Sequence, residues 1–169
     1  IAFEIIADKK THKEAEVRSK LIYLLSSTLG ASGLAGGQSL DLNFENKKTK
    51  KTEILKMYHM KTSALFCFCC MAPFIIKSTQ YKELKFAKQY GELFGMIFQI
   101  IDDYKDEFEN FKKLGKTPGK DKKQGKSTNL QHIKKNEVIP YGENLSNQFI
   151  KKNKNFFSQW NILRDLLLS

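Results

Sequence analysis

Hydrophobic residues recur at three- and four-residue intervals along nearly the whole chain, and this periodicity predicts helices. The clearest case is the segment 12–29, whose hydrophobic face contains Val17, Leu21, Leu24, Leu25 and Thr28. We expect helices over residues 1–8, 12–29, 34–42, 51–76, 81–110 and 144–168, with connections at 43–50, 78–81, 114–128 and 140–142. No segment of the sequence shows the sustained alternation typical of a β-strand, so the predicted fold class is all-α.

The size and composition of the chain limit the classes of function. Its 169 residues, 41% hydrophobic and 28% charged, are expected to form one globular domain. The formal net charge of +11 raises the question of a polyanionic partner. Only Arg18 and Arg164 are arginines, however, whereas proteins that read nucleic acid rely on arginine. We therefore expect no nucleic-acid ligand; a basic helical nucleic-acid binder is the alternative, with steeply salt-dependent affinity as its signature.

The cysteines and the longest apolar run indicate a cytoplasmic protein. Cys67, Cys69 and Cys70 lack the spacing of a metal or redox motif, so we interpret them as core thiols in a reducing compartment. The apolar run 64–76 is shorter than the about 20 residues that cross a membrane, so no transmembrane segment is expected. The chain opens at Ile1 in an amphipathic pattern already under way, which predicts a further segment upstream.

Three carboxylates and an amide share one face of the segment 98–106. At about 100° per residue, the residues within an arc of about 100° are Gln99, Asp102, Asp103 and Asp106. Like charges at this spacing destabilise a helix, and a hard divalent cation turns the repulsion into attraction. Mg²⁺ binds one or two carboxylates together with water and phosphate oxygens. The face is therefore a candidate Mg²⁺ site, with a solvated acidic helix face as the alternative.

A loop rich in glycine and lysine, residues 114–128, follows this acidic face directly. It places flexible backbone and ammonium groups where the phosphate of a metal-bound substrate would project. Five residues separate Gly119 from Gly125, one more than in a nucleotide-binding P-loop, and no strand is predicted before the loop. We reject nucleotide binding and expect phosphate-binding lysines here; a mobile charged loop is the alternative.

Two earlier segments add polar groups to the predicted bundle. The small residues at 30–37 indicate close helix packing or a helix break, and they lead into Gln38 and Asp41. The sequence His-Met-Lys-Thr at 59–62 places a cation and a hydroxyl ahead of the apolar wall 64–71. A single lysine usually extends to solvent, so this feature indicates little by itself.

Taken in order, these motifs resemble those of one enzyme family. GLAGGQSLDL, then His-x-Lys-Thr, then GxxFQIIDDYKD, then a loop with GK…GKD…GKST is similar to the downstream half of the trans-isoprenyl diphosphate synthases, the farnesyl and geranylgeranyl diphosphate synthase family. The resemblance covers about residues 1–128. It implies the isoprenoid synthase fold, a helical bundle around a central cavity that is here incomplete at the N-terminus, with residues 1–169 as the C-terminal portion of a single polyprenyl synthetase domain.

The resemblance also implies a reaction and a set of roles. The family is a group of prenyltransferases that condense isopentenyl diphosphate with dimethylallyl, geranyl or farnesyl diphosphate by Mg²⁺-assisted ionisation, condensation and elimination. The implied Mg²⁺ ligands are Asp102, Asp103 and Asp106. The implied catalytic groups, whose dipoles face the allylic cation, are Lys61, Thr62 and Gln99. The implied diphosphate-binding residues are Lys116 and Lys126, with Gln38 and Asp41 as supporting groups near the metal. A cytoplasmic homodimer is expected on the same ground.

The chain departs from the family pattern at Lys105, an unusual charge inside the aspartate motif, at Asn129 after Lys-Ser-Thr, and most clearly in what it lacks. The family's first aspartate-rich motif and its isopentenyl diphosphate site do not occur in these residues, so we expect a fragment or a partner chain that supplies them. A non-catalytic subunit that modulates a partner synthase is the alternative function. Terpene cyclisation is a nearer rival, but the glycine and lysine loop favours chain elongation.

Overall fold

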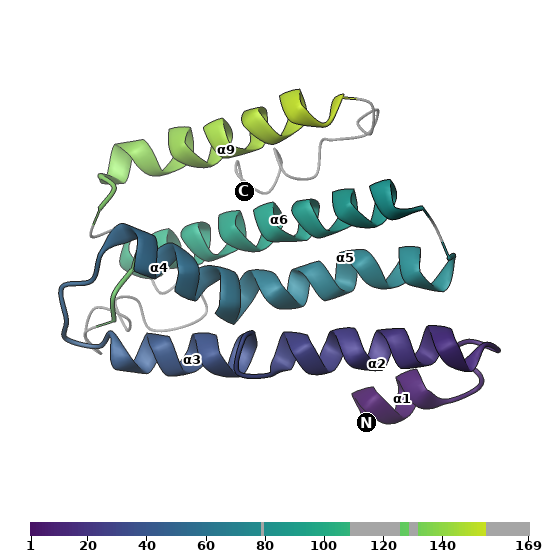
Figure 1. Ribbon diagram of the computed structural model, residues 1–169. Helices are drawn as coiled ribbons and strands as arrows, with labels where there is room; N and C mark the ends of the chain where they lie inside the picture. Colours follow the sequence, from purple (N-terminus) through teal and green to yellow (C-terminus); the bar gives the residue numbers. More distant parts are fainter. Residues whose placement is uncertain (79, 109–125, 129–131, 155–169) are drawn as a thin grey trace.

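The computed structural model is built from helices stacked side by side (Figure 1). It describes residues 1–78, 80–108, 126–128 and 132–154, and within these ranges it contains no strand. The elements are α1 (Ala2–Ala7), α2 (Ala15–Leu29), α3 (Leu34–Asn43), α4 (Lys51–Tyr58), η1 (His59–Ser63), α5 (Ala64–Ile76), α6 (Tyr81–Phe108), η3 (Lys135–Glu137) and α9 (Val138–Lys152). The all-α prediction is confirmed.

The rows of helices follow the order of the chain. Helices α2 and α3 lie end to end, and α4, η1 and α5 form the next row. Helix α6 lies beside α5, and α9 lies above α6 in the view of Figure 1. The predicted face of α2 is confirmed, since Val17, Leu21 and Leu25 are buried. A second cluster joins α4, α6, the segment before α9 and the first residue of α9, and its buried members are Ile54, Met57, Tyr58, Ile100, Ile133 and Val138.

The predicted bounds were wrong at the starts of α2 and α9 and at the expected connection 140–142. Helix α2 begins at Ala15 rather than at residue 12. Helix α9 begins at Val138, six residues before the predicted start at 144, and includes the expected connection 140–142. Pro140 lies in the first turn of α9, where a missing N–H leaves no helical hydrogen bond unmade, so proline does not break the helix there. The predicted helix end at 110 and residues 155–168 lie outside the described residues.

Glycines allow α3, η1, α5 and α6 to approach one another closely. A Cβ on Gly91 would lie 2.6 Å from Cα of Cys67, and one on Gly95 would lie 2.4 Å from Cα of Ser63. These two glycines are one turn apart on α6, so the backbone of α6 contacts η1 and α5 directly. A Cβ on Gly37 in α3 would lie 2.3 Å from the backbone nitrogen of Lys61. Close packing, one of the two interpretations of the small-residue segment, is therefore confirmed.

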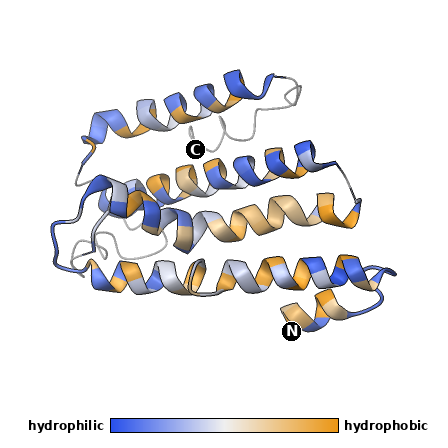
Figure 2. Cartoon of the chain, in the orientation of Figure 1, coloured by the Kyte–Doolittle hydropathy of each residue, from blue (hydrophilic) through white to orange (hydrophobic). Residues whose placement is uncertain are grey.

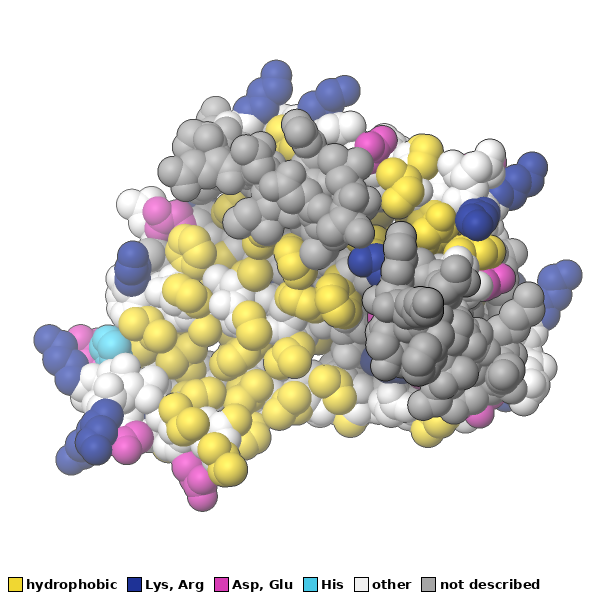
Figure 3. Space-filling view, turned by 180° about the vertical axis from the view of Figure 1, so that it is seen from behind, with side chains coloured by type: hydrophobic (Ala, Val, Ile, Leu, Met, Phe, Trp, Pro, Cys, Tyr) yellow, Lys and Arg dark blue, Asp and Glu magenta, His cyan; other side chains and the backbone are white. Residues whose placement is uncertain are grey.

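Helix α5 is the most apolar element (Figure 2). Together α4, η1 and α5 form a continuous run of 26 helical residues whose apolar 18-residue stretch has a mean hydropathy of 1.4, long and apolar enough by these measures to cross a membrane. The core helix of a bundle passes the same test; α5 packs against α2 and α6, but only 11% of the apolar stretch is buried. Hydrophobic side chains cover much of the face seen in Figure 3. The large exposed hydrophobic residues include Leu42, Leu65, Ile76 and Phe98.

The cysteines of α5 differ in their surroundings. Cys67 is buried and Cys70 half-buried, but Cys69 is exposed, so the prediction that all three are core thiols was wrong. Burial, and secondarily the Glu92 carboxylate, raises the pKa of the Cys67 thiol to about 12. Cys67 is therefore a neutral thiol at physiological pH and not a nucleophile.

Gly91→Ala is expected to lower the free energy of unfolding by about 1–3 kcal/mol, although alanine favours a helix by about 1 kcal/mol. The reason is that the new Cβ meets backbone atoms of α5, which cannot move aside as a side chain can. Urea unfolding of the intact protein measures the change. Lys82→Ala, at an exposed position of the same helix, is the control and should shift the free energy by less than about 0.5 kcal/mol. A Gly91→Ala protein as stable as wild type would contradict the close contact.

Candidate functional site

The acidic face predicted from the sequence lies on the last turns of α6. Gln99 and the three aspartates are all helical, because α6 continues unbroken to Phe108. Asp103 and Asp106 are 4% and 3% exposed, whereas Asp102 is half-buried. The simple alternative of a solvated acidic face therefore does not describe Asp103 and Asp106. Burial of a carboxylate is costly unless the group is hydrogen-bonded or bound to a cation.

Asp103 is held by two side chains from two elements. The Tyr58 hydroxyl, at the end of α4, donates to Oδ2 of Asp103. Nε2 of Gln99, one turn earlier on α6, donates to Oδ1 at 2.9 Å. Both carboxylate oxygens therefore accept a hydrogen bond from the protein, which fixes the orientation of Asp103.

The same hydrogen-bonded chain extends to η1. The Thr62 hydroxyl donates to Oε1 of Gln99 at 2.6 Å, so the two ends of the Gln99 amide have different partners. Thr62, Gln99, Asp103 and Tyr58 form a continuous polar chain, which we call the Gln99 chain. It joins two of the three predicted catalytic residues to one of the three predicted metal ligands.

Lys61 contacts a different helix. Its ammonium group donates to Oδ2 of Asp41 on α3, and the side chains of Lys61 and Asp41 are 27% and 5% exposed. The close approach of Gly37 to the Lys61 backbone makes this pair possible, because Asp41 lies one helical turn after Gly37. The predicted cation and the predicted supporting carboxylate are thus brought together. Gln38 is exposed, and no hydrogen bond from its side chain is seen within the described part of the chain.

Lys61 and Thr62 lie on a turn of π-helix, η1, between two α-helices. A π-turn contains one more residue per hydrogen-bonded ring than an α-turn, and such turns are frequent at functional sites. The wider turn lets Lys61 reach α3 while Thr62 reaches α6. The Tyr58 side chain, four residues before Thr62, points to the same helix, as residues at this spacing share a face.

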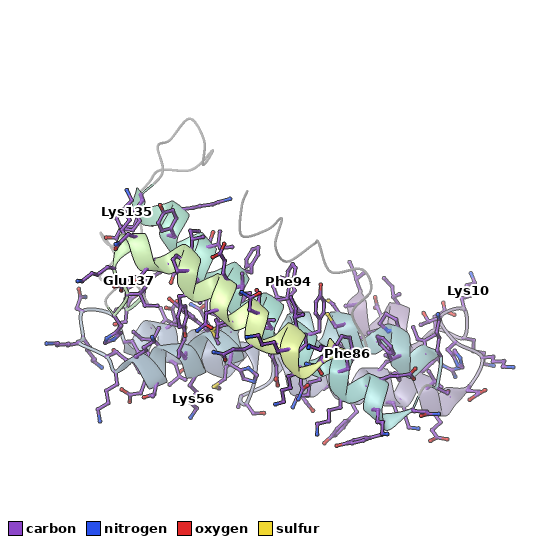
Figure 4. The ribbon with its side chains drawn as sticks, turned by 90° about the horizontal axis from the view of Figure 1, so that it is seen from above. Lys10, Lys56, Phe86, Phe94, Lys135 and Glu137 are labelled. Atoms are coloured by element: carbon purple, nitrogen blue, oxygen red, sulfur yellow. The ribbon has the colours of Figure 1, made fainter. Side chains whose placement is uncertain are left out.

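An aromatic cluster lies beside the polar chain. The ring of Phe66 on α5 lies 4.8 Å from the ring of Phe94 and 5.4 Å from that of Phe98, centre to centre. Phe86, further along α6, stacks on Phe149 of α9 at 5.9 Å, and Figure 4 shows Phe86 beside the C-terminal part of α9. Phe98 directly precedes Gln99 on α6, so this aromatic cluster adjoins the Gln99 chain.

Of the two predicted phosphate-binding lysines, Lys116 and Lys126, the structure describes only Lys126. Lys116 lies outside the described residues. Lys126 is described and half-buried, and the next residue, Ser127, is 1% exposed. The Ser127 hydroxyl donates to the carbonyl oxygens of Phe44 and Lys47, at 2.9 Å each. The backbone of Lys126 therefore lies next to the connection between α3 and α4.

The donors present suit Mg²⁺ in chemistry, since carboxylate oxygens are the hard ligands that it prefers. No group of three His, Cys, Asp or Glu side chains converges within the described ranges in a manner that could hold a metal by itself. This arrangement fits a cation that takes one or two carboxylates from α6 and its other ligands from water and phosphate.

The sequence analysis did not identify Tyr58 as a site residue, although its hydroxyl bonds to Asp103. Its position in the helical pattern predicts a core residue, and its ring does lie in the core cluster with Ile54 and Ile100. The available signal was its spacing of four from Thr62, which places it on the same helix face.

A helical bundle of this kind is the isoprenoid synthase fold. Over 98% of this chain it superposes on 55% of the geranyltransferase of Helicobacter pylori solved with magnesium and isoprenyl diphosphate, with a TM-score of 0.80 and 22% sequence identity. The sequence description of polyprenyl synthetases matches residues 1–156, and the chain belongs to the polyprenyl synthetase family.

Curated relatives agree with this assignment. The chain is 35% identical over 128 residues to geranylgeranyl diphosphate synthase of Cyanophora paradoxa, which is 75% of this chain and 43% of the relative. It is 32% identical over 114 residues to farnesyl diphosphate synthase of Bacillus subtilis, which is 68% of this chain and 38% of the relative. The chain thus spans about two fifths of the length of these relatives.

Tyr58→Phe is expected to lower the free energy of unfolding by about 1–3 kcal/mol, because it leaves Oδ2 of the buried Asp103 without this donor. The ring stays in place, so packing changes little. Urea unfolding of the intact protein measures the loss. Tyr141→Phe removes a hydroxyl from another ring that packs against the same core cluster and serves as the control. Equal effects of the two substitutions would show that the hydrogen bond to Asp103 contributes nothing particular.

Proposed function

We propose that the intact protein is a prenyltransferase that condenses isopentenyl diphosphate with an allylic diphosphate to a short-chain polyprenyl diphosphate. The observation that carries this proposal is the Gln99 chain, which joins Thr62 on η1 to Asp103 on α6 through direct hydrogen bonds. Membership of the polyprenyl synthetase family supports it, as do the names of the curated relatives.

The aspartates of α6 would hold Mg²⁺ against the allylic diphosphate. When bound, Mg²⁺ neutralises charge on the diphosphate and makes it a better leaving group. Asp103 is already oriented by Tyr58 and Gln99, so its position does not depend on the cation. Asp102, the most accessible of the three, is the carboxylate best placed to share a ligand shell with substrate oxygens.

Thr62 of η1 and Gln99 of α6 would act at the carbon end of the bond between the allylic group and its diphosphate. Thr62 and Gln99 present oxygen dipoles beside the aromatic cluster of α5 and α6. Dipoles that are fixed before the reaction stabilise a developing carbocation without reorganisation. Lys61 is paired with Asp41, so the pair adds little net charge near that cation. Lys116 and Lys126 would bind oxygens of the departing diphosphate.

The family resemblance further supports a homodimer in the cytoplasm. We propose that residues 1–169 form the C-terminal portion of one polyprenyl synthetase domain. The first aspartate-rich motif would then come from elsewhere in the intact protein or from a partner chain.

Asp102→Ala is expected to reduce product formation by orders of magnitude. The assay uses the intact protein, radiolabelled isopentenyl diphosphate, and dimethylallyl, geranyl or farnesyl diphosphate, with and without Mg²⁺. Removing a cation ligand weakens stabilisation of the departing diphosphate, a contribution worth several kcal/mol. Glu92→Ala, which removes a carboxylate about ten residues earlier on α6, is the control and should leave the rate near wild type.

The opposite result would favour the alternative function. An intact, folded protein that forms no product with any of the three allylic substrates would exclude catalysis by this protein alone. Addition of a partner synthase would then test whether the protein changes that partner's rate or product length.

A further inference from the structure

Thr49 occupies the connection between α3 and α4 and is 5% exposed. Its hydroxyl lies 3.2 Å from the Ser127 hydroxyl, although 78 residues separate the two in sequence. Ser127 also contacts the carbonyl oxygens of Phe44 and Lys47, at 2.9 Å each. A hydroxyl has one proton, so the two carbonyls share the proton of Ser127 and Thr49 is the donor in the third contact.

Thr49 makes a second contact with the segment before α9, through its backbone carbonyl. The carbonyl oxygen of Thr49 lies 2.8 Å from Nε2 of His132. Ile133, the next residue, is 8% exposed and packs in the core cluster that contains Tyr58. The chain is thus attached to the α3–α4 connection both at Ser127 and at His132. We call the contacts of Thr49 with Ser127 and His132 the Thr49 clasp.

The clasp is rigidly connected to the candidate site. Lys50 follows Thr49 directly, and its N–H donates to the Glu53 carboxylate at 3.2 Å, which caps the start of α4. Helix α4 continues without a break into η1, which carries Lys61 and Thr62. Tyr58, which donates to Asp103, lies on the same helical unit. A residue attached to Thr49 is therefore fixed relative to all of these groups.

We propose that Thr49 and Ser127 are positioning residues that fix Lys126 relative to Lys61, Thr62 and the aspartates of α6. This inference rests on the proposed function, in which Lys126 binds the substrate diphosphate. A lysine side chain has many rotamers, and a backbone that could also move would add to the entropy lost on binding. With its neighbour anchored by three hydrogen bonds, Lys126 loses less freedom when it binds a phosphate.

The chain offers a closely matched control. Ser146, on α9, is 7% exposed, and its hydroxyl has no hydrogen-bond partner within the residues that the structure describes. Ser127→Ala and Ser146→Ala therefore remove the same atom from two buried sites. Only the first removes the contacts to Thr49, Phe44 and Lys47.

The test measures binding of inorganic pyrophosphate to the intact protein by calorimetry, with Mg²⁺ present. We expect Ser127→Ala to weaken binding about tenfold, as the loss of about 1.4 kcal/mol would. Ser146→Ala should bind within about twofold of wild type, since it lies outside the site. Thr49→Val should weaken binding less than Ser127→Ala does, because it leaves the two carbonyl contacts of Ser127. Thr49→Ser keeps the hydroxyl and should bind as wild type does.

A double-substitution cycle separates positioning from a merely structural role. If Ser127 acts through Lys126, then Lys126→Ala with Ser127→Ala binds pyrophosphate no more weakly than Lys126→Ala alone. Additive effects, or an unchanged affinity in both Ser127→Ala and Thr49→Val, would overturn the proposal. Should Ser127→Ala fail to fold, the Thr49→Val and Thr49→Ser pair decides in the same way.

The same measurements distinguish failure of the positioning role of Thr49 and Ser127 from failure of the proposed function. If Lys126→Ala weakens binding but the clasp variants do not, the inference fails while the proposed function stands. If wild type itself does not bind pyrophosphate with Mg²⁺, or Lys126→Ala binds as tightly as wild type, the diphosphate role of Lys126 fails and the positioning role falls with it.

Discussion

The candidate site depends on close backbone contact around η1. Gly37 of α3 and Gly95 of α6 each meet η1 where a Cβ would overlap backbone atoms. At this separation, short side chains can bridge neighbouring elements, and Thr62 reaches Gln99 with a single hydroxyl. With larger residues in place of the glycines, the helices would lie further apart and the same polar groups would face gaps or water.

The π-turn at η1 and the burial of Asp103 follow from the same geometry. One wide turn lets Lys61 bond to α3 while Thr62 bonds to α6, so a single segment joins two helices. A buried carboxylate is tolerated because donors occupy both of its oxygens. The result is a set of hydrogen-bonded dipoles and charges near aromatic rings, which need not reorganise when charge develops beside them.

The chain corresponds to part of the length of its polyprenyl synthetase relatives. It matches the polyprenyl synthetase family over residues 1–156 and spans about two fifths of the curated relatives. Within that portion lie the buried carboxylates of α6 and Lys126, whose neighbour Ser127 belongs to the Thr49 clasp. In the proposed function both would handle a diphosphate, so this part of the protein would serve the leaving group and the allylic cation and not the attacking substrate.

The sequence by itself determined the helical class, most helix positions and the shared face of Gln99 and the aspartates, because periodicity and spacing are local properties of a helix. It did not determine the start of α9, since a proline in a first turn and a proline in a loop look alike in sequence. Only the tertiary structure decided that Tyr58 bonds to Asp103, that Lys61 bonds to Asp41, and that Thr49 meets Ser127. These contacts join residues 20 to 78 positions apart, and they depend on the distance and rotation between packed helices, which no local pattern encodes.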